Sequence, residues 1–155
     1  MSQRLDYAHI ASGGMKALGG VHGYVAQSGL PKALVDLVYL RVSQINGCAS
    51  CIDMHSRDLA KDGTAVEKLV LVPVWREADG LFSERERAAL RWAETVTRVV
   101  DTGVPDVEFE AASTHFSEKD LADLTIAIGL MNAYNRMAIS FRTTPEAAKR
   151  QQHAG

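Results

Sequence analysis

Apolar side chains recur at helical spacing along nearly the whole chain, and no stretch shows the alternation that marks a half-buried strand. Residues 32–45 are apolar on nearly every face, a pattern typical of a helix buried inside a bundle. The pattern therefore predicts an all-α fold, a helical bundle of about six to seven helices. The expected helices cover residues 4–27, 32–45, 48–61, 64–72, 83–100, 106–115 and 117–141.

The starts of three of these helices carry polar residues that can bind the free backbone N–H groups of a first turn. Ser83 with Glu86, and Thr64 with Glu67, have the spacing of a capping box. Ser117 precedes the long apolar helix and is a favoured N-cap residue. We therefore expect side-chain caps at all three positions.

The chain has 155 residues, which is the usual length of one domain, and no linker or internal repeat divides it. We expect one helical domain over residues 1–142. Residues 143–155 are mostly polar and predict a flexible tail.

Charge and hydropathy exclude several classes of partner. The formal net charge is -2 and the 17 Lys and Arg residues are scattered, so no nucleic-acid partner is expected. The most apolar stretch, residues 121–141, contains Asp123, Asn135 and Arg136, which are costly in lipid, so we expect a bundle helix and no membrane span. Residues 1–6 are polar and do not resemble a signal peptide, which predicts a cytoplasmic, reducing location.

The segment from Cys48 to His55 carries the candidate chemistry, because it holds a CxxC pair followed by a histidine one turn later. On a helix, Cys51 lies about 60° around the axis from Cys48, and His55 about 20°, so one face carries all three. Along the axis His55 is roughly 6 Å from Cys51 but roughly 10 Å from Cys48, which favours Cys51 as the thiol that it deprotonates. Cys48 lies at the helix N-terminus, where the helix dipole favours a thiolate. Two activated thiols at this spacing predict reversible two-electron redox chemistry.

Asp36 is a further candidate, since it is the only acidic residue in the apolar helix over residues 32–45. A buried carboxylate needs a partner or a role. A salt bridge to Arg41 or to a neighbouring chain, or exposure at the start of the helix, would explain Asp36 equally well.

Two other interpretations of the cysteines are open. Cys48, Cys51 and His55 could bind zinc with Asp36 or Asp53 as the fourth ligand, although the sequence offers no second cysteine pair. The cysteines could also be buried apolar residues without chemistry. We favour the redox pair over both, and we expect no bound metal and no bound redox cofactor.

The run from Leu34 to His55, in which Leu-Arg-Val-Ser-Gln-Ile-Asn-Gly-Cys leads into CxxCxxxH, resembles the core of the AhpD-like alkylhydroperoxidase and carboxymuconolactone decarboxylase superfamily. A weaker likeness extends to residues 73–77, 83–86 and 130–136. The resemblance implies an all-helical fold that assembles as a homo-oligomer, either a trimer or a hexamer.

In AhpD-like members the cysteine pair reduces hydroperoxides, and electrons arrive from an external dithiol on a lipoyl-carrying protein, without a bound flavin. The family's cysteines match Cys48 and Cys51, its histidine matches His55, and its relay glutamate falls on Asp36. Two positions depart from the pattern. The side chain of Asp36 is shorter than that of glutamate by about 1.5 Å, one C–C bond length, and Ser50 stands where the best-known members have histidine.

The residues and the resemblance together predict a thiol-dependent peroxidase acting on a hydroperoxide. One alternative is a lyase of the carboxymuconolactone decarboxylase kind, in which His55 transfers a proton and the cysteines are incidental. Another is a non-enzymatic thiol redox sensor. The cysteine pair favours the peroxidase, because the decarboxylase branch does not depend on one.

Overall fold

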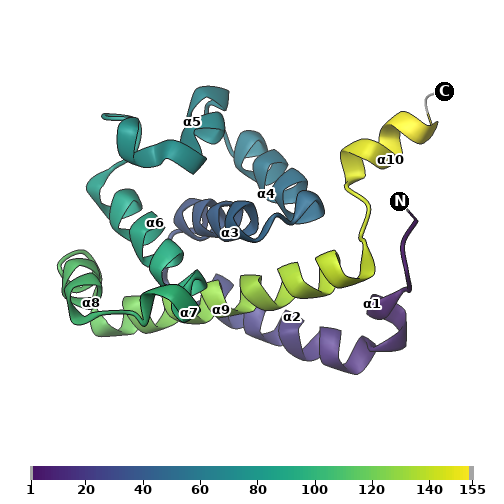
Figure 1. Cartoon of the computed structure of the whole chain (residues 1–155), viewed down its shortest axis with the longest axis horizontal. Coiled ribbons are helices and arrows are strands. Elements are labelled where there is room, and N and C mark those ends of the chain that lie inside the picture. The colour runs from purple at the N-terminus through teal and green to yellow at the C-terminus, as the bar shows by residue number, and fades with distance from the viewer. Residues whose placement is uncertain (1, 154–155) are drawn as a thin grey trace.

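The computed structural model describes residues 2–153, and these residues form helices and no strand (Figure 1). The all-α prediction is confirmed. The described residues form more helices than the expected six to seven, because short helices fill several connections. The elements are α1 (Tyr7–Ile10), α2 (Ser12–Ala26), α3 (Lys32–Asn46), α4 (Ala49–Lys61), α5 (Val66–Leu71), the 3₁₀ segment η1 (Val72–Glu77), α6 (Glu84–Thr97), α7 (Val99–Thr102), α8 (Asp106–Ser113), α9 (Glu118–Phe141) and α10 (Glu146–His153).

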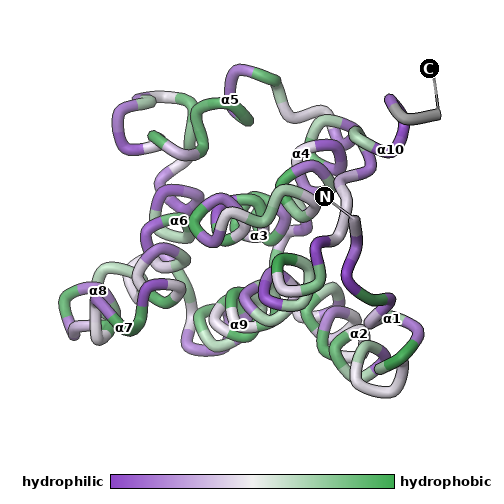
Figure 2. Tube along the Cα trace, turned by 45° about the vertical axis from the view of Figure 1, so that its right-hand side comes forward, coloured by the Kyte–Doolittle hydropathy of each residue, from purple (hydrophilic) through white to green (hydrophobic). Residues whose placement is uncertain are grey.

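Helix α3 lies in the centre of the bundle, packed against α4, α6 and α9 (Figure 1). All residues from Leu34 to Ser43 are buried, which confirms the prediction from its apolar faces. Val38 and Val42 pack into a core shared with α6 and α9, while Leu37 packs into a second core with α4 and η1. Each such side chain stabilises the fold by about 1.5–3 kcal/mol when fully buried. The outer helix α6 carries hydrophilic and hydrophobic residues side by side, as expected for a surface helix (Figure 2).

Two of the three expected caps are present. Ser83 and Glu86 form a complete capping box at the start of α6, and the Ser117 hydroxyl accepts from the backbone N–H of Asp120 at 3.1 Å. The box at Thr64 is wrong, because α5 begins only at Val66 and has no side-chain cap. The N–H of Thr64 instead binds the carbonyl oxygen of Leu59 at 2.9 Å, which closes the end of α4.

The turn between α3 and α4 fixes where the cysteine segment begins. Gly47 has a left-handed backbone (φ 71°), which any residue with a Cβ adopts only with strain. Its N–H binds the carbonyl of Gln44, and the N–H of Cys48 binds the carbonyl of Ser43 at 2.9 Å. Cys48 therefore becomes the N-cap residue of α4, with Cys51 in the first turn.

The segment after α9 turns towards α4, and α10 lies beside α4 at the edge of the bundle (Figure 1). Arg142 adopts a left-handed backbone (φ 56°) at the end of α9, and α10 follows. The N–H of Ala147 donates to a carboxylate oxygen of Asp53 at 3.1 Å, which ties α10 to α4. Part of the polar segment is thus helical, while its expected flexibility and the domain boundary at residue 142 stay predictions.

Within residues 2–153, no helix combines the length and the apolar character needed to cross a membrane. The long helix α9 is a bundle helix, as expected. Its Asp123 is 2% exposed and accepts hydrogen bonds from Tyr24 and Lys119.

Candidate active site

Cys48 and Cys51 are joined by a disulfide at the N-terminus of α4, with their Cα atoms 5.4 Å apart. The three-residue step between an N-cap and a first-turn position brings the two sulfurs together without bending the helix. Both residues are buried, and both pack against Ala138 of α9. The structure thus pairs the two cysteines that the sequence singles out.

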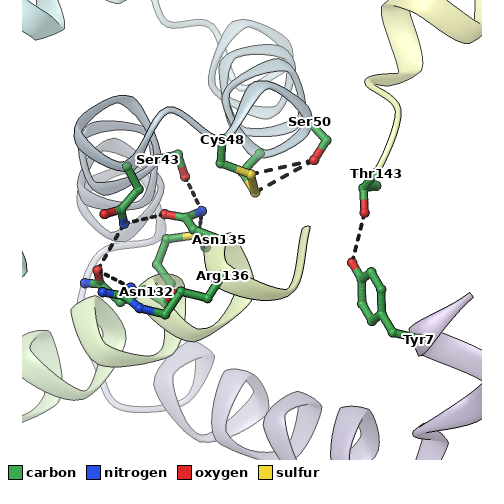
Figure 3. The surroundings of a disulfide bond; sticks show 11 residues. Tyr7, Ser43, Cys48, Ser50, Asn132, Asn135, Arg136 and Thr143 are labelled. Carbon is green, nitrogen blue, oxygen red and sulfur yellow. Dashed lines mark hydrogen bonds between the residues drawn. A yellow bond between two sulfur atoms is a disulfide. The ribbon is translucent and has the colours of Figure 1, made fainter. Parts of the chain in front are cut away.

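A network of amide side chains holds the disulfide turn to α9 (Figure 3). Asn135 is fully buried, and its Nδ2 donates to the Ser43 hydroxyl at 3.0 Å. The Nδ2 of Asn46 donates to Oδ1 of Asn135 at 2.9 Å and to Oδ1 of Asn132 at 3.0 Å. Because Ser43 also accepts from the N–H of Cys48 through its carbonyl, the network fixes the start of α4.

His55 lies one turn beyond Cys51 and is 4% exposed. Neither of its ring nitrogens has a hydrogen-bond partner among the described residues, and its ring centroid lies 5.2 Å from that of Tyr39. Burial lowers the pKa of His55 below its usual value of 6.5, and the charge of Asp36 opposes this only in part. His55 is therefore neutral at neutral pH and can accept a proton.

The structure does not bring Asp36 into a hydrogen bond with His55. Asp36 is buried, and its carboxylate accepts from Lys32, one helical turn earlier, at 2.7 Å. The alternative partner, Arg41, is wrong as well, because its guanidinium binds Glu94. Asp36 acts on His55 through its charge, which raises the pKa of the imidazole.

Two cavities meet at the disulfide, and each is lined by one of the cysteines. Cys51 and His55 line a cavity of about 490 Å³ together with Met131 and Tyr134, most of whose wall is apolar. Cys48 lines a second cavity of about 410 Å³ beside Arg142. Four residues line both cavities: Ser50, Ala138, and Thr143 and Thr144 of the segment after α9. The hydroxyl of Thr143 is 3.3 Å from that of Tyr7, and both residues line the cavity of Cys51 (Figure 3).

A second buried polar cluster was not predicted from the sequence. Glu94 on α6 is 5% exposed and accepts from Arg41, from the indole N–H of Trp75, and from Arg76. Burial raises the pKa of Glu94, but these donors outweigh it and hold the pKa below its usual value. The sequence signal is an arginine and a glutamate at apolar positions of their helices, which is visible only once the two helices are paired.

The described residues contain no group of three or more His, Cys, Asp or Glu side chains arranged to hold a metal ion. Asp53, the other candidate fourth ligand for zinc, accepts from Arg57 on its own helix at 3.0 and 3.1 Å.

The all-helical fold of this chain is similar to those of AhpD-like proteins of known structure. The model of the carboxymuconolactone decarboxylase family matches residues 14–95, which is just over half of the chain. The chain belongs to the carboxymuconolactone decarboxylase family.

Three known proteins are similar to this chain. YdfG of Bacillus subtilis (strain 168), an uncharacterised protein, is 37% identical over 140 residues, which cover 90% of this chain and 95% of YdfG. The crystal structure of ATU0492 from Agrobacterium tumefaciens, a protein of unknown function and a candidate antioxidant defence protein AhpD, has 40% identity and a TM-score of 0.89, covering 93% of this chain and 98% of its own. The alkyl hydroperoxide reductase AhpD of Methylocella silvestris is 44% identical over 45 residues, 29% of this chain and 25% of that protein.

Proposed function

We propose that the protein is a thiol-dependent peroxidase in which Cys48 and Cys51 cycle between a dithiol and a disulfide. The observation that carries the proposal is the setting of Cys51. It is paired with Cys48 and lines a largely apolar cavity together with His55, a buried histidine without a hydrogen-bond partner. The likeness to the AhpD of Methylocella silvestris supports the proposal.

The proposed cycle begins with the reduced pair. Neutral His55 accepts the thiol proton of Cys51, and the thiolate attacks the terminal oxygen of a hydroperoxide. The O–O bond breaks, Cys51 becomes a sulfenic acid, and the alkoxide leaves as an alcohol with the proton from His55. Cys48 then attacks the Cys51 sulfur, and the hydroxide leaves as water with the thiol proton of Cys48. The structure has the disulfide that this step forms.

An external dithiol returns the pair to its reduced state. One donor thiolate attacks a sulfur of the disulfide, and the second donor thiol releases the mixed disulfide, so that the donor leaves oxidised. We propose a lipoyl-carrying protein as the natural donor.

We also propose that the active form is a homo-oligomer, a trimer or a hexamer. Large apolar side chains are exposed on the isolated chain, Val100 at 95% and Ile10 at 70%, which supports a covering partner. Light scattering on the purified protein tests the size.

The test of the function is hydroperoxide consumption with dihydrolipoamide as the donor. We expect turnover with the parent protein and with His9→Asn, a histidine on the surface, and loss of turnover in Cys51→Ser and in Cys48→Ser. If both cysteine variants match the parent, the peroxidase proposal fails. Activity on a lactone that survives Cys51→Ser but not His55→Ala would assign the lyase alternative, and reversible disulfide formation without turnover would assign the redox sensor.

A further inference from the structure

Ser50 lies between the two cysteines, in the first turn of α4, and its hydroxyl faces both sulfurs (Figure 3). Its Oγ is 3.7 Å from Sγ of Cys48 and 4.0 Å from Sγ of Cys51. A disulfide sulfur carries no proton, so the hydroxyl is the donor in both contacts. Among residues 2–153 this hydroxyl has no partner other than the two sulfurs.

The position of Ser50 in its helix explains why its proton is available. Hydroxyls further along a helix donate to the carbonyl oxygen four residues earlier, as Ser113 does to Phe109 at 2.8 Å and Thr125 to Leu121 at 2.7 Å. Ser50 is in the first turn, and the residue four positions before it, Asn46, ends the preceding helix. Ser50 makes no hydrogen bond to that carbonyl, so the two sulfurs are the acceptors that its hydroxyl has among the described residues.

We propose that Ser50 is a further catalytic residue, a shared donor whose hydroxyl binds whichever of the two cysteine sulfurs carries negative charge. The catalytic role of Ser50 rests on the proposed thiol cycle, whereas its contacts with the two sulfurs are present in the disulfide itself. The hydroxyl has one proton and can serve one sulfur at a time. The Ser50 hydroxyl therefore changes its acceptor when the negative charge passes from one sulfur to the other.

The charge moves between the sulfurs in a defined order. Before oxidation the charge is on Cys51, and for the closing step it is on Cys48. When a donor thiolate attacks one sulfur of the disulfide, the S–S bond breaks and its electron pair leaves with the other sulfur as a thiolate. Hydrogen bonds to a thiolate stabilise it relative to the thiol, so Ser50 lowers the barrier to each of these steps.

The experiment measures both thiols one at a time. Cys48 is titrated in the Cys51→Ala background and Cys51 in the Cys48→Ala background, by the pH dependence of the rate of alkylation with iodoacetamide. In each background Ser50→Ala should raise the pKa of the remaining thiol by about one unit, the size expected for one lost hydrogen bond to a charged group. Ser50→Thr, which keeps the hydroxyl, should leave the pKa of the remaining thiol close to its value with Ser50.

Ser56→Ala is the matched control, because Ser56 is half-buried on the same helix and lines neither cavity. A shift in only one of the two thiols overturns the shared role, and so does a shift that Ser56→Ala or Ser50→Thr reproduces in full. Circular dichroism verifies that each variant folds.

The titration uses no hydroperoxide, so its outcome is independent of the peroxidase assay. Raised pKa values at both thiols in a protein without peroxidase activity would support the Ser50 proposal and sink the proposed function. Peroxidase activity in the parent with unchanged thiols in Ser50→Ala would do the reverse.

Discussion

Two buried polar regions are built on α3, and they treat their polar atoms in opposite ways. Around Arg41, the carboxylate of Glu94 accepts hydrogen bonds from three side chains, one on α3 and two on η1. Around Tyr39, the phenol oxygen and both nitrogens of His55 have no partner among the described residues. The two regions belong to one helix, so the difference lies in what surrounds it.

An unsatisfied buried polar group costs about 1–3 kcal/mol, which makes its retention informative. The Glu94 cluster joins α3, η1 and α6, and both carboxylate oxygens of Glu94 accept hydrogen bonds within it. The region of His55 opens onto the cavity beside Cys51 and leaves its nitrogens free to take or give a proton. The first region therefore stabilises the fold, and the second is available for chemistry.

The largest effect that this comparison predicts is on stability. Glu94→Gln removes the charge that balances buried Arg41, and we expect the free energy of unfolding to fall by about 3–5 kcal/mol. Urea unfolding followed by circular dichroism measures it, with Glu110→Gln, an exposed glutamate, as the control. A stable Glu94→Gln protein without activity would reverse the roles of the two regions.

His55→Asn tests the other region. Losing the general base should lower turnover about 100-fold or more, whereas stability should change far less than in Glu94→Gln, since no hydrogen bond to His55 is lost. The measurement pairs hydroperoxide turnover with urea unfolding of the same preparation, and His9→Asn serves as the control. Full turnover in His55→Asn would mean that the free nitrogens have no part in the reaction.

The amide network tests whether stability also reaches the site. Asn135→Leu removes the α9 partner of Ser43 and one of the two α9 partners of Asn46, and we expect the free energy of unfolding to fall by about 1–3 kcal/mol. Unfolding is compared in the oxidised and the reduced protein. An unchanged midpoint in both states would show that the network does not contribute to holding the turn.

The smallest expected effect concerns pH. Burial lowers the pKa of His55, so turnover should persist below pH 6.5 before it is lost on the acid side. Asp36→Asn removes a charge that raises this pKa, so the acid limb should move to still lower pH, with turnover changing less than about tenfold. A limb that moves upward contradicts the assignment.

The same depressed pKa has a consequence for stability. Below about pH 6.5 the histidine of the unfolded chain takes up a proton before the folded one does, so His55 makes stability fall with falling pH until its folded pKa is passed.

The helices could be predicted because their periodicity and caps are local. The capping box of Ser83 depends on residues within one turn and is present, whereas the box of Thr64 is displaced by the closing bond of the helix before it. The disulfide pairing of Cys48 with Cys51 was also within reach, because one helical turn determines it.

The rest of the site depends on contacts between residues far apart in the chain. The pair of Asn46 and Asn135 spans 89 positions and that of Arg41 and Glu94 spans 53, so neither has a local signal. The partner of Asp36 was missed for another reason. Lys32 lies one turn before Asp36 and Arg41 lies just over one turn after it, and spacing alone does not decide which of them binds the carboxylate.

Asn46 precedes Gly47, and an asparagine followed by glycine is prone to deamidation. In a flexible peptide the glycine nitrogen attacks the side-chain carbonyl carbon of the asparagine, and ammonia leaves. Here that nitrogen donates its proton to the carbonyl of Gln44, and the Asn46 amide donates to Asn132 and Asn135. Deamidation would set a carboxylate against two carbonyl oxygens. We therefore expect deamidation only in molecules whose contact between α3 and α9 has opened. The rate at which an acidic charge variant appears would then report how often that contact opens.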